Sequence, residues 1–147
     1  MAKLSAADTA RLWEGLTHAH HVMTAALEND MLPGAGMPLG WFEVLDLLTR
    51  APSGLMRFQE LAKMAGITDS GASRRLDQMI KAGLIERSSC HTDRRGVFAR
   101  LTTRGRAAHK RAHAVFIRSL TKNLGRHLEP DEAASLRVVL ERLRTAS

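Results

Sequence analysis

The sequence predicts a mainly helical fold with one small β-hairpin, and three observations lead to this prediction. Apolar residues recur at steps of three and four over most of the chain, as they do on the buried face of a helix. Glycines and prolines divide these stretches into segments of helical length. One region, residues 84–102, alternates between apolar and polar residues, which is typical of strands. The 147 residues are enough for one domain whose core needs no disulfide or metal.

The N-terminal third is predicted to hold two helices. A long amphipathic helix is expected over about residues 8–29, where apolar positions follow helical spacing. Residues 32–38 include two prolines and two glycines and are predicted to form a loop, because these residues do not continue a helix. A second helix is expected over about residues 39–50. Its apolar positions indicate that nearly all of it is buried: Trp41, Phe42, Val44, Leu45, Leu47 and Leu48.

Two short helices joined by a tight turn are predicted next. The first covers about residues 58–65 and ends at Gly66, where a left-handed residue can stop it. Thr68 is suited to cap the second helix, which ends before Gly83. This arrangement is a helix-turn-helix. The outer face of its second helix carries small, polar or cationic side chains: Ser70, Ser73, Arg74, Asp77, Gln78 and Lys81.

A β-wing and two further helices complete the prediction. Strands are expected over residues 84–89 and 97–102, with a polar tip between them. A long helix is expected to begin at Thr102 or Thr103, and a last helix at Pro130, a favoured first-turn residue. The predicted fold class is therefore mainly α with a small β-wing, a winged helix-turn-helix flanked by N- and C-terminal helices.

The net charge of +7 belongs to one region of the chain. Residues 68–111 hold 11 basic and 4 acidic residues, whereas the remainder is balanced at 11 of each. A charge excess focused on the helix-turn-helix and the wing is expected of a protein that binds nucleic acid. The alternative is a solvated basic face that has no partner.

Other classes of function find little support. The single cysteine, Cys90, excludes an intramolecular disulfide and fits a reducing compartment, so a cytoplasmic location is expected. No stretch approaches the roughly 18–20 apolar residues of a membrane span, and the N-terminus lacks the apolar core of a signal peptide. No nucleophile elbow, phosphate-binding glycine loop or carboxylate pair is visible, so neither an enzyme nor a cofactor is predicted.

Three short motifs connect the helix-turn-helix, the wing and the long helix: Gly83-Leu84-x-x-Arg87, Asp93-x-Arg95 and Leu101-Thr102-x-x-Gly105. Their order and spacing resemble the MarR family of bacterial winged-helix transcription regulators, and the resemblance covers nearly the whole chain. It implies a homodimer held by helices at about residues 8–29 and 103–146, with a winged helix at about 39–102. The apolar stripes of the terminal helices exceed what a winged helix needs to cover itself, which agrees with a partner.

The resemblance also implies a function. Members bind double-stranded DNA sequence-specifically, commonly as repressors that a small aromatic or phenolic effector releases. A two-fold dimer predicts a pseudo-palindromic site with half-site centres about 10 base pairs apart. The alternatives are an architectural protein that binds nucleic acid without sequence preference and a metal-responsive regulator.

The second helix of the helix-turn-helix supplies the predicted contacts to the major groove, where each base pair presents its own donors and acceptors. Thr68 and the N-terminus of this helix are suited to a phosphate. The residues expected to reach base edges are Ser70, Ser73, Arg74 and Gln78.

The remaining predicted DNA contacts are arginines. The resemblance places Arg94 and Arg95 of the wing in the minor groove, unless one of them pairs with Asp93 and braces the wing. Arg75 and Arg87 are as well suited to hold the domain together as to contact DNA.

The sequence offers candidates for an effector site and for a metal site. By the resemblance, the walls of an effector crevice are expected to include Trp13, His20, Trp41 and Phe42, and the alternative is that these are ordinary core and interface aromatics. Two histidine pairs stand about one helical turn apart, His18 with His21 and His109 with His113. No further ligand completes either set, so no metal site is predicted. Cys90 lies in the wing rather than in the first helix, which argues against thiol sensing.

Overall fold

The computed structural model describes residues 3–90 and 92–146. Within these ranges, a few side chains lie outside the description: Asp69, Ala72, Cys90, Asp93 and Arg94. The chain forms two compact units. We call residues 28–116 the winged-helix unit, and residues 1–27 together with 117–147 the terminal-helix unit.

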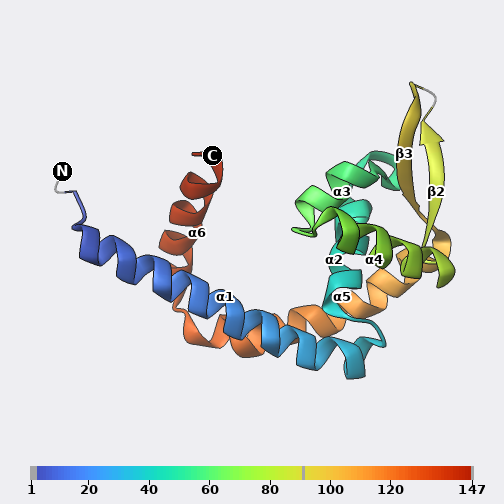
Figure 1. The fold of residues 1–147 in the computed structure, drawn as a ribbon. Coiled ribbons are helices and arrows are strands. Elements are labelled where there is room, and N and C mark those ends of the chain that lie inside the picture. The colour runs from blue at the N-terminus through green and yellow to red at the C-terminus, as the bar shows by residue number, and fades with distance from the viewer. Residues whose placement is uncertain (1–2, 91, 147) are drawn as a thin grey trace. The chain divides into compact units, whose positions relative to one another are not determined.

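The winged-helix unit contains the predicted helix-turn-helix and wing (Figure 1). Its elements, in chain order, are α2 (Leu39–Arg50), the 3-10 turn η1 (Pro52–Gly54), β1 (Leu55–Arg57), α3 (Phe58–Met64), α4 (Asp69–Lys81), β2 (Ile85–Cys90), β3 (Asp93–Leu101) and the first part of α5 (Thr103–Asn123). The predicted helices 39–50 and 58–65 are confirmed to within a residue.

The sheet has three antiparallel strands in the order β1-β3-β2. Ala99 of β3 pairs with Met56 of β1 on one side and with Arg87 of β2 on the other. The prediction of a two-stranded wing missed β1, because three residues are too short to show alternation. The strands of the hairpin also extend into the segment predicted as its polar tip, since β2 reaches Cys90 and β3 begins at Asp93.

The core of this unit lies between α2, the helix-turn-helix and the sheet. Phe42, Val44, Leu45 and Leu48 of α2 are at most 1% exposed, and Leu61, Leu76, Met79 and Ile85 bury to the same degree. Substituting alanine for a side chain this deeply buried typically lowers the stability of a protein by about 2–5 kcal/mol. The predicted burial of α2 is confirmed, although Trp41 and Leu47 are only half-buried.

The loop predicted at residues 32–38 is confirmed only for residues 36–38, because α1 runs from Ala6 to Ala35 and contains Pro33. A proline this near a helix end removes one hydrogen bond, while buried Met31 and Met37 anchor the surrounding chain. The helix stops at Gly36, which has φ +70° and whose N–H donates to the carbonyl of Leu32 at 3.0 Å. The left-handed glycine, and not the proline, ends the helix.

The terminal-helix unit consists of the first part of α1, the end of α5, the turn η2 (Gly125–His127) and α6 (Pro130–Thr145). Glu129 and Glu132 form a capping box at the start of α6, and Pro130 begins the helix as predicted. Among its described residues, Leu27 and Ser119 are the buried ones. None of the described helices combines the length and apolar character needed to cross a bilayer.

Candidate nucleic-acid interface

The turn between α3 and α4 fixes the start of the second helix. Gly66 adopts φ +63°, and the N–H of Ile67 donates to the carbonyl of Ala62 at 3.0 Å. Thr68 follows in extended conformation, and its Oγ1 accepts a hydrogen bond from the N–H of Gly71 at 3.4 Å. Thr68 is therefore the N-cap of α4, as predicted.

The outer face of α4 presents all four predicted base-contacting side chains. Ser70, Ser73, Arg74 and Gln78 are exposed, whereas Leu76 and Met79 on the opposite face are at most 1% exposed. The buried side chains fix the rotation of the helix about its axis. The polar set therefore faces away from the core as one surface.

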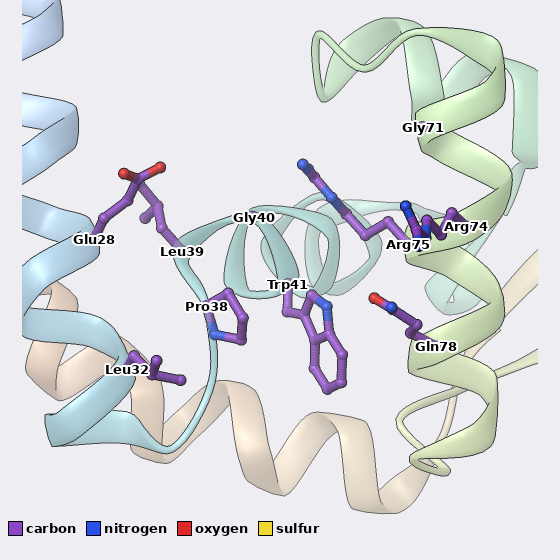
Figure 2. Close-up of a pocket in the computed structure, with 10 residues that line it drawn as sticks. All are labelled: Glu28, Leu32, Pro38, Leu39, Gly40, Trp41, Gly71, Arg74, Arg75 and Gln78. Carbon is purple, nitrogen blue, oxygen red and sulfur yellow. The ribbon is translucent and has the colours of Figure 1, made fainter.

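Arg75 lies against α2. A Cβ built on Gly40 would lie 2.7 Å from Cζ of Arg75, so the guanidinium occupies the space that the glycine leaves free. Figure 2 shows the side chain extending from α4 toward α2. Of the two predicted roles, this contact agrees with holding the domain together.

Arg87 connects three elements of the same unit. Its Nη2 donates to Oδ1 of Asp77 on α4 at 2.7 Å, and its Cζ lies 4.9 Å from the ring centroid of Phe58, the first residue of α3. Both partners of the ion pair are half exposed, at 55% and 51%, so the pair contributes little net stability. Its effect is to orient the guanidinium plane.

The wing arginines are placed only in part. Arg95 lies on β3 and its exposed side chain lines a pocket at the base of the wing, beside Arg57 and Gln59. The side chains of Arg94 and Asp93 lie outside the described residues. The sequence did not point to Arg57 or Gln59, because Arg57 belongs to the missed strand β1 and Gln59 lies at the start of α3, outside the recognition helix.

The motif residues at the base of the wing have a structural explanation. The hydroxyl of Thr102 lies 2.7 Å from the carbonyl oxygen of Gly83 and 2.9 Å from that of Leu84, and it accepts from the N–H of Gly105 at 2.9 Å. A Cβ on Gly105 would lie 1.9 Å from the oxygen of Leu84. The Thr-x-x-Gly spacing therefore caps α5 and lets its first turn meet the chain that enters β2.

The four predicted effector residues occupy different surroundings. Trp13 is 70% exposed on α1, and His20 is also exposed on that helix. Phe42 is 1% exposed and packs against Phe116 at 4.5 Å between ring centroids, which agrees with the alternative of a core aromatic. Trp41 is half-buried and lines a pocket of the winged-helix unit.

This pocket has a volume of about 470 Å³ (Figure 2). Its apolar side includes Leu32, Pro38 and Trp41, and its polar side includes Arg75 and Gln78 of α4. Figure 2 shows the Gln78 side chain pointing toward the indole. An apolar wall opposite a few polar groups is the common form of a small-molecule site.

The histidines of α5 have a role that the sequence did not reveal. Nε2 of His109 lies 2.9 Å from Oδ1 of Asp46 on α2, and its ring stacks on Phe42 at 5.3 Å. The i, i+4 spacing of His109 and His113 therefore serves packing between α2 and α5. Over the ranges that the structure describes, no three His, Cys, Asp or Glu side chains are grouped so as to hold a metal ion.

Comparisons with known proteins agree with this architecture. A model of the MarR family matches residues 35–96. The Multiple antibiotic resistance protein MarR of Escherichia coli (strain K12) is 32% identical over 84 residues, which are 57% of this chain and 58% of that protein. The HTH-type transcriptional repressor Rv2887 of Mycobacterium tuberculosis is 32% identical over 108 residues, 74% of this chain and 76% of that protein.

A solved structure is similar over nearly the whole chain. It is that of Sco3205, a MarR family transcriptional regulator from Streptomyces coelicolor, in complex with DNA, with a TM-score of 0.83 and 26% identity over 99% of this chain and 91% of that one. Rv2887 is named a transcriptional repressor and Sco3205 a transcriptional regulator. The sequence match, the winged helix and its capped Thr-x-x-Gly joint together show that this chain belongs to the MarR family.

Proposed function

We propose that the chain is a sequence-specific regulator of transcription that binds double-stranded DNA, acting as a homodimeric repressor on a pseudo-palindromic operator. The observation that carries this proposal is the outer face of α4, where Ser70, Ser73, Arg74 and Gln78 are exposed together. The relative Sco3205 was solved in complex with DNA, and Rv2887 is named a repressor.

The chemistry of this face suits base readout. An arginine can donate two hydrogen bonds to O6 and N7 of guanine, a glutamine can pair with adenine, and a serine can donate or accept at either. Arg74 and Gln78 supply the first two, and the short side chains of Ser70 and Ser73 allow close approach to the groove. Thr68 and the N-terminus of α4 meet a phosphate, and Arg94 and Arg95 reach the minor groove.

Dimerisation follows from the exposed apolar side chains of the terminal helices. Trp13 is 70% exposed, Val138 57% and Leu143 54%. Many large apolar side chains left exposed in this way mark an interface, and a second copy of the chain covers them. The two α4 helices then reach successive major grooves about 10 base pairs apart.

An aromatic carboxylate is the proposed effector class. Rv2887 was solved in complex with p-aminosalicylic acid. In this chain the pocket of Figure 2 offers the indole of Trp41 to a ring and the guanidinium of Arg75 to a carboxylate. Because Arg75 lies on α4, a ligand there changes the position of the recognition helix and so binds the DNA-competent state less tightly. Trp13 and His20 of α1 do not line this pocket, and their part in effector binding stays a prediction from the sequence.

Fluorescence anisotropy tests the proposal. The purified protein is titrated onto DNA from upstream of its own gene and onto a scrambled duplex of equal length, each over a salt series. We expect the native duplex to bind at least roughly a thousandfold more tightly at physiological salt. Equal affinity and equal salt dependence on both duplexes would instead identify a nucleic-acid binder without sequence preference and overturn the base-reading role of Arg74.

A further inference from the structure

A second cationic site lies at the base of the wing, apart from the recognition helix. It is a pocket of about 320 Å³ lined by residues of β1, α3, β2 and β3. Its polar lining brings three arginines and one amide together: Arg57, Arg87, Arg95 and Gln59. None of the described residues that line it is acidic.

Two of these guanidinium groups lie over aromatic rings. Cζ of Arg57 lies 5.1 Å from the ring centroid of Phe98, and Cζ of Arg87 lies 4.9 Å from that of Phe58. The attraction between a guanidinium and the face of a ring restricts the position of the side chain. Preorganisation lowers the conformational entropy that binding would otherwise cost.

Gly96 makes room for this arrangement. A Cβ built there would lie 2.7 Å from Cε2 of Phe98 and 3.0 Å from Nη1 of Arg57. Both atoms belong to the stacked pair, so any side chain at position 96 would displace the guanidinium or the ring. The glycine of the wing therefore shapes the pocket as well as the hairpin.

The pocket adjoins the DNA-reading face. Phe58 and Gln59 line it and also line a neighbouring pocket that includes Ser73 of α4. A ligand at the base of the wing would thus lie between the major-groove contacts of α4 and the minor-groove contacts of the wing tip. The planar donor forks of the arginines match the oxygens of a phosphate.

The geometry points to a clamp for one phosphate of the DNA backbone, in which Arg57 donates to the phosphate oxygens and Gln59 adds an amide donor. Arg57 is thereby a DNA-binding residue that lies outside both the recognition helix and the wing tip. This inference rests on the proposed function. The clamp sets the position of the winged helix on the duplex and carries no sequence information, because every base pair has the same phosphate.

The first test replaces Arg57 with glutamine, and Arg50→Gln is its matched control. Arg50 is an exposed arginine of the same unit that pairs with Asp46 at 2.9 Å and lines a different pocket. At about 100 mM salt we expect R57Q to bind the native and the scrambled duplex each about tenfold more weakly, with their affinity ratio unchanged. The log–log salt slope should fall by about 0.9 for each clamp that engages DNA. Equal slopes for R57Q and R50Q overturn the clamp.

The second test locates the phosphate. Duplexes carrying a single neutral methylphosphonate are scanned along the backbone with the wild-type protein and with R57Q. The clamp predicts one position in each half-site at which the wild type loses about tenfold and R57Q loses nothing further. Additive losses at every position overturn it. If R57Q melts at a lower temperature, Arg57→Lys keeps the charge without the planar fork and is scanned instead.

These measurements separate the two proposals. A wild-type protein without duplex preference contradicts the proposed function, while a smaller salt slope for R57Q on the scrambled duplex still supports the clamp. A strong duplex preference together with an unchanged R57Q slope contradicts the clamp alone.

Discussion

The winged-helix unit buries its large apolar side chains, whereas the terminal-helix unit leaves many of them exposed. In the first, Leu45, Leu48 and Leu61 are completely buried within a single chain. In the second, Leu12, Leu140 and Leu143 are 46–55% exposed, and the buried residues among those described are Leu27 and Ser119. The winged-helix unit also includes residues 68–111, which hold the charge excess of the whole chain.

This difference separates two tasks. A unit that buries its own core can present a rigid polar face to DNA whether or not a partner is bound. A pair of long helices with uncovered apolar faces lacks most of the hydrophobic stabilisation that burial provides, about 25 cal/mol for each Å². This difference supports the proposed homodimer, in which a second copy covers the terminal helices, whereas the winged helix buries its core within one chain.

The largest expected effect comes from the joint between the wing and α5. Gly105→Ala places a Cβ 1.9 Å from the carbonyl oxygen of Leu84, and neither backbone segment can move without breaking the Thr102 hydrogen bonds. We expect a loss of more than about 4 kcal/mol, seen as a lower melting temperature by circular dichroism.

Gly15→Ala is the matched control in the other unit. Gly15 lies inside α1 and has nothing within 4 Å of its built Cβ, so alanine should stabilise that helix by about 0.5–1 kcal/mol. If both variants melt like the wild type, the tight joint described at Gly105 is wrong.

The next effect compares the same kind of substitution in the two units. Leu45→Asp buries a carboxylate in the winged-helix core, and we expect it to unfold the chain at any protein concentration. Leu143→Asp adds the same charge to a side chain that is 54% exposed, so the winged-helix unit should stay folded while the dimer dissociates.

Sedimentation equilibrium and melting curves over a range of protein concentration measure both variants. The melting temperature of a dimer rises with concentration, and that of a monomer does not. Ser135→Asp, at an exposed polar position of the same helix, is the control for charge. A Leu143→Asp variant that sediments as the wild type does would show that α6 takes no part in the interface.

A smaller effect distinguishes two adjacent arginines of α4. Arg74→Ala should weaken binding to the native duplex by about 1–3 kcal/mol and lower its preference over the scrambled one, because a base contact is lost. Arg75→Ala should lower the melting temperature and leave that preference intact, since Arg75 packs on Gly40. Anisotropy and thermal melting of both variants test this, and interchanged results would reverse the two roles.

Sequence periodicity was sufficient to predict the structure where one physical cause determines it. The helix-turn-helix, the Thr68 cap and the burial of α2 follow from local capping and from apolar spacing, and the structure confirms them. Where tertiary packing decides, periodicity failed. Pro33 lies within a helix held by buried Met31, and β1 forms only because β3 is beside it.

The candidate site likewise has one part that could be predicted from the sequence and one part that could not. The exposed face of α4 could be predicted because helical geometry alone places its side chains. The cluster at the base of the wing could not be predicted, because Arg57, Arg87 and Arg95 lie on three different strands. They meet only through the register of the three-stranded sheet. The contact between His109 and Asp46 depends on helix packing in the same manner.

The smallest expected effect concerns the start of α1, in the terminal-helix unit. The hydroxyl of Ser5 donates to Asp8 at 2.6 Å and Arg11 pairs with the same carboxylate, and these contacts hold the pKa of Asp8 below its ordinary value of 3.8. A carboxyl whose pKa is lowered by folding contributes stability above its unfolded pKa and loses it as the pH falls through the folded value.

The first turn of α1 should therefore fray below about pH 4. Side-chain carbon shifts of Asp8 followed by NMR give the titration, and amide exchange of the first turn gives the fraying. Ser5→Ala removes the largest cause of the shift and should move the titration of Asp8 upward. If the titration midpoint of Asp8 is unchanged in this variant, the contact between Ser5 and Asp8 does not persist in solution. The terminal helix then begins later than Ala6.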